Sequence, residues 1–145
     1  MLTGLFALML LALALPAQAK SETEAKAMLD KAVAVMKSDG KERAFAQFHD
    51  QKGAFFDGEL YVFVVNFEGK WEAYGPKPSA VGTSLINLKD VDGKEFVKEM
   101  IDIAKTKGEG SIEYQWKNPE TQKIQPKITF FKRVDDVLVA VGVYK

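Results

Sequence analysis

Residues 60–82, LYVFVVNFEGKWEAYGPKPSAVG, carry the strongest indication of the fold. The run of β-branched and aromatic residues at 61–65 predicts a strand. Glu68 and Gly69 predict a tight turn, and residues 70–74 predict a returning strand. Two prolines end that strand, because proline cannot donate a hydrogen bond to a neighbouring strand. The stretch therefore predicts a β-hairpin and a loop, which is either an ordinary surface loop or a wall of a small-molecule pocket.

Two amphipathic helices are predicted before this hairpin. Apolar residues recur with helical spacing through residues 21–37, and Ser21 or Thr23 is a suitable N-terminal cap. A shorter helix follows, with Ala44 and Phe48 among its inward residues. Each helix has one apolar face, so we expect both to lie against a sheet.

A third helix and three more strands are predicted after the hairpin. The third helix is expected to be capped by Asp90 or Asp92 and to run to about Lys107, where Gly108 ends it. Its buried face is expected to consist of Phe96, Val97, Met100, Ile101 and Ala104. Strands are expected at 111–117, 124–134 and 137–144. This order predicts an α+β fold: an antiparallel five-stranded sheet with N-terminal helices and one helix inserted between the second and third strands.

Alternation of side chains assigns aromatic residues of two strands to faces of the sheet. In the returning strand of the hairpin, Trp71 is expected to share a face with Ala73, opposite Tyr74. In the strand after the third helix, Tyr114 and Trp116 share a face and are expected to point toward the core. These assignments assume an unbroken period of two.

The composition excludes several classes of function. The chain has 20 acidic and 20 basic residues, so nucleic acid is not an expected partner. It has no cysteine and one histidine, which excludes thiol chemistry and Cys or multi-His metal sites. His49 is interpreted as a helix-end residue, because no nucleophile or partner is placed for a catalytic base. We therefore predict neither enzymatic activity nor a cofactor.

Residues 1–19 predict a secretory signal peptide. Leucine and alanine dominate this segment, and an A-x-A pattern at 17–19 is typical of a cleavage site. Cleavage after Ala19 would start an exported, periplasmic chain at Lys20. The alternative is an uncleaved membrane anchor, although the apolar run is shorter than the roughly 20 residues that span a bilayer.

Six short motifs follow one another along the rest of the chain. They are Tyr61-Val62-Phe63-Val64 with Glu68-Gly69, Pro78-Ser79-Ala80-Val81-Gly82, Asp90-Val91-Asp92-Gly93-Lys94, a G-x-x-x-Y-x-W-x-N-P pattern at 110–119, Pro126-Lys127, and Gly142-Val143-Tyr144. Their order and spacing resemble the single Cache domain family, the extracytoplasmic PAS-like sensor module of bacteria. The resemblance implies one Cache domain over residues 20–145. Because the sequence stops soon after the last strand, it also implies a free-standing periplasmic member.

The resemblance implies a sensor that binds a small organic molecule, often a carboxylate, between the sheet and the 74–88 loop. Its implied partners are that ligand and a membrane histidine kinase or chemoreceptor, through which it would serve signal transduction or chemotaxis. The alternative is a ligand-independent interaction module that docks on such a receptor. Relatives commonly carry His, often followed by Pro, where this chain has Tyr74 and Gly75, and this difference bears on the choice of ligand.

Six residues are predicted to contact the ligand: Tyr74, Tyr114, Trp116, Lys127, Trp71 and Phe56. Lys127 is the candidate carboxylate-binding residue, because a charge among apolar strand residues is costly to bury unless it is paired. By alternation it shares a face with Thr129 and Phe131. The alternative is a solvated lysine on an exposed face of the sheet.

Overall fold

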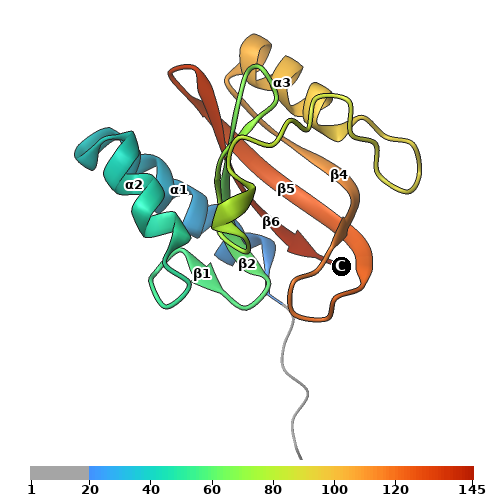
Figure 1. Cartoon of the computed structure of the whole chain (residues 1–145), viewed down its shortest axis with the longest axis horizontal. Helices are drawn as coiled ribbons and strands as arrows, with labels where there is room; N and C mark the ends of the chain where they lie inside the picture. The colour runs from blue at the N-terminus through green and yellow to red at the C-terminus, as the bar shows by residue number, and fades with distance from the viewer. Residues whose placement is uncertain (1–19) are drawn as a thin grey trace, which may run out of the picture.

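The computed structural model describes residues 20–145, and the predicted signal peptide at 1–19 lies outside the described residues. The helices are α1 (Glu22–Asp39), α2 (Lys41–His49), η1 (Pro78–Ala80) and α3 (Phe96–Lys107), and the strands are β1 (Phe56–Asp57), β2 (Leu60–Asn66), β3 (Trp71–Tyr74), β4 (Glu109–Lys117), β5 (Ile124–Val134) and β6 (Val137–Tyr144). The predicted α+β fold is confirmed, with α3 inserted between β3 and β4 (Figure 1). The prediction that Asp90 or Asp92 caps α3 is wrong, because Asp90 accepts backbone hydrogen bonds within a turn that precedes the helix.

One antiparallel sheet of six strands forms the centre of the fold. Strand β2 pairs with β6, β6 with β5, and β5 with β4. The other edge of β2 is shared: β1 pairs with it at Leu60 and Tyr61, and β3 pairs with it from Phe63 to Val65. The prediction of five strands omitted β1, because a strand of two residues is too short to show alternation.

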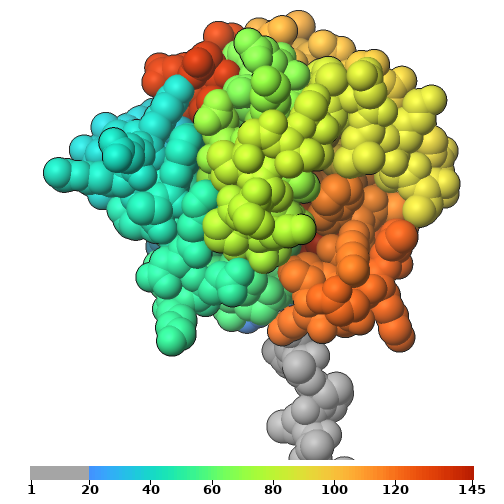
Figure 2. Space-filling model, viewed as in Figure 1, coloured from blue at the N-terminus to red at the C-terminus, as the bar shows by residue number. Residues whose placement is uncertain are grey.

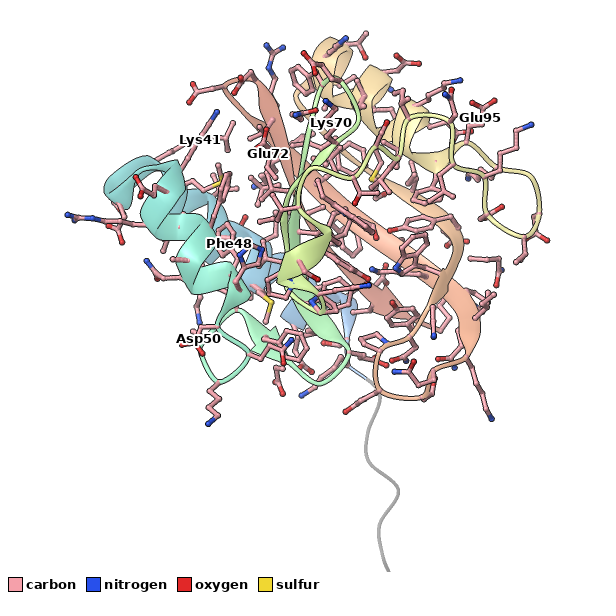
Figure 3. The ribbon with its side chains drawn as sticks, in the orientation of Figure 1. Lys41, Phe48, Asp50, Lys70, Glu72 and Glu95 are labelled. Carbon is pink, nitrogen blue, oxygen red and sulfur yellow. The ribbon has the colours of Figure 1, made fainter. Side chains whose placement is uncertain are left out.

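Both faces of the sheet are covered. Helices α1 and α2 lie on one face, and α3 with the loop that precedes it lies on the other (Figure 1). Phe48, on the side of α2 that faces the sheet, is fully buried (Figure 3). Every residue of β6 is buried, which explains its apolar run of valines in place of an alternating pattern.

The first helix begins where the sequence predicts. The Ser21 side chain caps it by accepting a hydrogen bond from the backbone N–H of Glu24 at 3.1 Å. The predicted apolar stripe is buried: Ala25, Met28, Leu29, Ala32 and Met36.

Within residues 20–145, no helix combines the length and apolar character needed to cross a bilayer.

A β-bulge changes which residues of β3 share a face. Consecutive residues of β2 pair with Trp71 and with Ala73, so Glu72 has no partner in β2. Trp71 and Tyr74 therefore lie on the same face, with ring centroids 4.1 Å apart and planes inclined by 8°. Ala73 packs instead on the side of α1 and α2. The prediction that Trp71 shares a face with Ala73 is wrong, because the bulge interrupts the period of two.

The loop after β3 is fastened to the hairpin. Trp71 donates its backbone N–H to the carbonyl of Thr83 at 3.2 Å and accepts one from Gly82 at 2.8 Å. Leu85 donates its N–H to the carbonyl of Gly69 at 2.7 Å, and its side chain is buried on the α3 side of the sheet. The loop thus satisfies backbone groups along the outer edge of β3 and covers part of the α3 side of the sheet.

We predict that Gly69→Ala destabilises the protein more than Gly82→Ala. Both glycines have positive φ, 87° and 90°, which costs an alanine about 1–2 kcal/mol. A Cβ on Gly69 would also lie 2.7 Å from Cβ of Ile86, whereas one on Gly82 meets nothing within 4 Å. Urea unfolding should show roughly 1–3 kcal/mol of additional loss for Gly69→Ala. Equal losses would mean that the Ile86 contact does not constrain the turn.

Candidate functional site

Lys127 of β5 is buried, with 1% of its surface exposed. It shares the α3-covered face of the sheet with buried Thr129 and Phe131, as alternation predicts. The alternative of a solvated lysine on an exposed face is therefore wrong. The covering elements are far away in the sequence, so the pattern within β5 alone left both possibilities open.

The Lys127 side chain extends from β5 across β6 to β2. Its amino group donates a hydrogen bond to the Tyr61 hydroxyl of β2 at 2.8 Å, although β6 lies between the two strands. Gly142 of β6 makes this path possible. A Cβ at that position would lie 2.5 Å from Cε of Lys127 and 2.4 Å from Oγ1 of Thr129.

Tyrosine hydroxyls continue the hydrogen bonding from Lys127. The hydroxyls of Tyr61 and Tyr144 are 3.1 Å apart, and Tyr144 donates to the backbone carbonyl of Lys117 at 2.9 Å. Because the Tyr144 proton goes to that carbonyl, Tyr61 is the donor to Tyr144 and accepts from Lys127. Burial raises the pKa of both hydroxyls, so they stay protonated and the chain of donors keeps one direction.

Four aromatic rings surround the Lys127 amino group. Its Nζ lies 4.4 Å from the ring centroid of Tyr61, 5.1 Å from those of Phe63 and Tyr144, and 5.9 Å from that of Tyr114. Ring faces attract a cation, yet they replace water poorly. Within residues 20–145, Tyr61 is the only hydrogen-bond acceptor of Nζ, so two of the three N–H bonds of the ammonium form have no acceptor.

Burial determines the protonation of Lys127. Removal from water lowers the pKa of its amino group to about 7, while the negative charge of Glu59 acts weakly in the opposite direction. The amine is therefore divided between its charged and neutral forms near neutral pH. A bound anion would favour the charged form.

A small cavity of about 10 Å³ lies beside Lys127. Its lining is Tyr61, Phe63, Trp71, Tyr74, Leu85, Phe96, Val97, Tyr114, Trp116 and Lys127. This volume is enough for about one water molecule. A larger ligand therefore requires side chains of the covering loop or of the aromatic wall to move.

Five of the six residues predicted to contact a ligand line this cavity. Phe56 does not, because its ring stacks behind Tyr61 with centroids 6.3 Å apart. Tyr61 and Phe63 were not among the predicted contacts. Their period of two within the apolar run at 61–65 places them on one face, and this signal was sufficient to find them. Tyr144 lies in a strand buried on both faces, where the sequence contains no such signal.

A groove of about 490 Å³ opens on the surface next to the cavity. Its lining is Tyr74, Pro76, Lys77, Lys89, Asp90, Val91, Gln115, Trp116, Lys117, Pro119, Gln122 and Ile124. Figure 2 shows the surface hollowed where the yellow-green loop meets the orange end of β4 and its turn. Tyr74 and Trp116 line both spaces, and Nε1 of Trp116 donates to the Tyr74 hydroxyl at 3.4 Å. This pair separates the groove from the cavity.

Two contacts position the walls of the groove. Asp90 accepts hydrogen bonds from the backbone N–H groups of Asp92, Lys94 and Gln115, all at 2.9 Å, and so joins its loop to the edge of β4. On the other side, the backbone N–H of Tyr74 donates to Nε2 of His49 at 3.0 Å. His49 ends α2, as predicted, and it holds β3 against that helix.

A sequence model of a Cache domain matches residues 16–144. The chain belongs to the Cache domain family. Cache domains are extracytoplasmic sensor domains. The resemblance inferred from the sequence motifs is confirmed.

Solved structures share the fold of this Cache domain. A methyl-accepting chemotaxis protein from Vibrio parahaemolyticus RIMD 2210633 is 22% identical, with a TM-score of 0.72 over 84% of this chain and 86% of that one. The periplasmic sensor domain of a chemotaxis protein is 20% identical, with a TM-score of 0.67 over 82% and 86%. A Cache chemosensory domain studied for carboxylic acid recognition is 19% identical, with a TM-score of 0.65 over 84% and 86%. At these identities the likeness shows the fold alone.

We predict that the stability of this Cache domain rises with pH relative to Lys127→Met. The pKa of Lys127 is about 7 in the folded protein and about 10.5 in the unfolded chain, so the unfolded chain binds more protons between these values. Wild-type stability should therefore gain up to roughly 4 kcal/mol over this window, measured by urea unfolding at pH 6–10.

The exposed Lys123 offers the matched control for this measurement. Lys123→Met should follow the wild-type pH dependence, because Lys123 lies at the surface in the turn after β4. Parallel curves for the wild type and Lys127→Met would contradict the effect of burial on Lys127.

Proposed function

We propose that this Cache domain senses a small organic acid whose carboxylate binds the Lys127 ammonium in the cavity. The observation that supports this most strongly is the burial of Lys127: among the described residues, two N–H bonds of its ammonium form have no acceptor. A buried ammonium is costly unless it is paired. A carboxylate would supply the counter-charge and the missing acceptors together.

The lining of the cavity fits the rest of such a ligand. Trp71, Phe96 and Tyr114 offer apolar and aromatic surface, while the Tyr74 hydroxyl and the Trp116 indole lie where the cavity meets the groove. A ligand would enter from the groove by separating the Tyr74–Trp116 pair. The carboxylic acid recognition described for one similar solved structure supports this class of ligand.

The size of the ligand limits its affinity. Because the cavity of about 10 Å³ must expand, a metabolite of roughly six non-hydrogen atoms is a reasonable upper range. Such a molecule gains at most about 1.5 kcal/mol per atom, or about 9 kcal/mol in total. The corresponding dissociation constant is about 0.3 μM or weaker, which suits a sensor of external metabolites.

We further propose that the domain is exported after cleavage behind Ala19 and signals in the periplasm through a membrane chemoreceptor or histidine kinase. The sensor domains of chemotaxis proteins with this fold support a receptor as the partner. The alternative is ligand-independent docking on such a receptor. Exposed Val91 and Ile124 at the rim of the groove favour that alternative, because apolar side chains at a surface suit a protein contact.

We predict that small carboxylates raise the melting temperature of the wild type and of Lys123→Met, but not of Lys127→Met. Amines and amino acids are screened beside them. A ligand at about 100 times its Kd adds about 2.7 kcal/mol, which is a shift of several degrees at this chain length. An equal shift for Lys127→Met would remove Lys127 as the carboxylate-binding residue. A screen without any shift would favour the docking alternative.

We also predict that carboxylate binding takes up a proton. The amine pKa of about 7 rises when a carboxylate pairs with it, so affinity should be constant below about pH 7 and fall by up to about tenfold per pH unit above it. Calorimetry at pH 8 in buffers of different ionisation enthalpy should show an uptake approaching about one proton per ligand. Affinity independent of pH between 6 and 9 would contradict a Lys127–carboxylate pair.

A further inference from the structure

Glu59 is a nearly buried carboxylate in the turn between β1 and β2, with 9% of its surface exposed. Its Oε2 accepts a hydrogen bond at 3.2 Å from the side-chain amide of Asn118, which is itself 2% exposed. Its Oε1 accepts one at 3.2 Å from the backbone nitrogen of Lys20. None of the ion pairs formed among residues 20–145 involves Glu59.

Among the described residues this carboxylate forms no ion pair, and the one positive group on which its charge acts, the Lys127 amine, is hydrogen-bonded to Tyr61 instead. Two neutral N–H donors satisfy its hydrogen bonding, but burial of a charge is costly without an opposite charge nearby. The obvious candidate, the Lys20 side chain, is already used, because its Nζ pairs with Asp57 at 2.8 Å. What approaches Glu59 from Lys20 is the backbone nitrogen.

Cleavage after Ala19 would change the charge of that nitrogen. A peptidase specific for the A-x-A pattern would add one water across the Ala19–Lys20 peptide bond. The departing peptide keeps a carboxylate, and Lys20 keeps an α-amino group, which is protonated at neutral pH. The neutral amide donor at 3.2 Å from Glu59 would thereby become an ammonium at the same place.

We propose that Glu59 is the binding site for the new α-ammonium group of Lys20, and that this ion pair fastens the start of α1 to the β1–β2 turn in the processed protein. The inference rests on the proposed export, but it is independent of any ligand. Both positive groups of the N-terminal lysine then have a carboxylate partner, Glu59 for the α-ammonium and Asp57 for the ε-ammonium.

The position of Lys20 relative to α1 gives the ion pair a second effect. Ser21 caps the helix, so the α-ammonium would lie one residue before the cap. A positive charge at a helix N-terminus opposes the helix dipole. Glu59 would offset this charge from outside the helix. The acidic residues Glu22 and Glu24 in the first turn of α1 would contribute in the same direction.

Only a chain that begins at Lys20 would place its α-ammonium group at Glu59. One additional residue would move the ammonium about 3.8 Å along the chain and leave Glu59 with an amide donor. A chain that keeps Ala19 as its first residue is therefore a close control. It has the same contacts from Lys20 onward but carries its charge elsewhere.

The test uses the full chain, exported, processed and purified from the periplasm. Intact mass should show a first residue of Lys20. The rate at which an amine-acylating reagent modifies the α-amino group is then followed by mass spectrometry from pH 6 to pH 10. In the wild type the α-amine should react at least about tenfold more slowly at pH 7 than in Glu59→Gln, because the ion pair raises its pKa above the usual range of about 7.7–8.0.

Thermal unfolding gives a second readout with a defined sign. A raised pKa in the folded state stabilises the protein fully below about pH 7.7, and the effect is lost as the pH rises through the raised value. The wild type should melt several degrees above Glu59→Gln and above the chain that keeps Ala19, and these differences should shrink above about pH 9. Asp57→Asn should keep the slow acylation, since it removes only the ε-ammonium partner.

Three outcomes would overturn the proposal. The first is a processed chain that begins at a residue other than Lys20, or no processing at all. The second is an α-amine that reacts as fast in the wild type as in Glu59→Gln. If Glu59→Gln does not fold, the comparison with the Ala19-retaining chain decides, and equal acylation rates there are the third. None of these outcomes depends on whether a carboxylate binds Lys127.

Discussion

The cost of burying the Lys127 amine is the constraint to which the centre of this domain is adapted. The side chain crosses β6 only because Gly142 has no Cβ in its path. Its nitrogen then meets Tyr61, the first of two hydroxyls whose donated protons end at a backbone carbonyl. These contacts leave the ammonium form with a buried charge that no anion among the described residues pairs with, whereas the neutral amine carries no charge. A carboxylate bound there, as proposed, would change the preferred charge of a group at the centre of the sheet.

The elements that close the cavity lie on one face of the sheet. Helices α1 and α2 cover the opposite face with an uninterrupted apolar cluster. On the site face, the cavity is closed by a hairpin strand with a bulge, a loop and the Tyr74–Trp116 pair. Opening that pair would disturb β3, which is joined to α2 through His49. A ligand in the cavity therefore has a physical connection to a helix on the far face.

The turn after β4 links the two charged sites of the molecule. The carbonyl of Lys117 accepts the last hydrogen bond of the tyrosine chain, and the next residue, Asn118, orients the carboxylate of Glu59. Glu59 in turn favours the charged form of Lys127 through its negative charge. Under the proposed cleavage after Ala19, an ammonium at Lys20 would reduce this influence and so lower the tendency of Lys127 to be charged.

Patterns within short stretches of the sequence were sufficient to predict most of the secondary structure and the family of this protein. Periodicity identified the helices, the hairpin and five strands, and the order of short motifs identified the family, because both depend on residues near one another in the chain. Alternation also placed Lys127, Thr129 and Phe131 on one face. Alternation assigned Trp71 to the wrong face, because a bulge shifts the register of β3. It could not predict β1, because that strand has only two residues. The burial of Lys127, its contact with Tyr61 two strands away and the closed state of the cavity required the folded structure, since each depends on segments that meet only through sheet pairing and packing across long separations in the sequence.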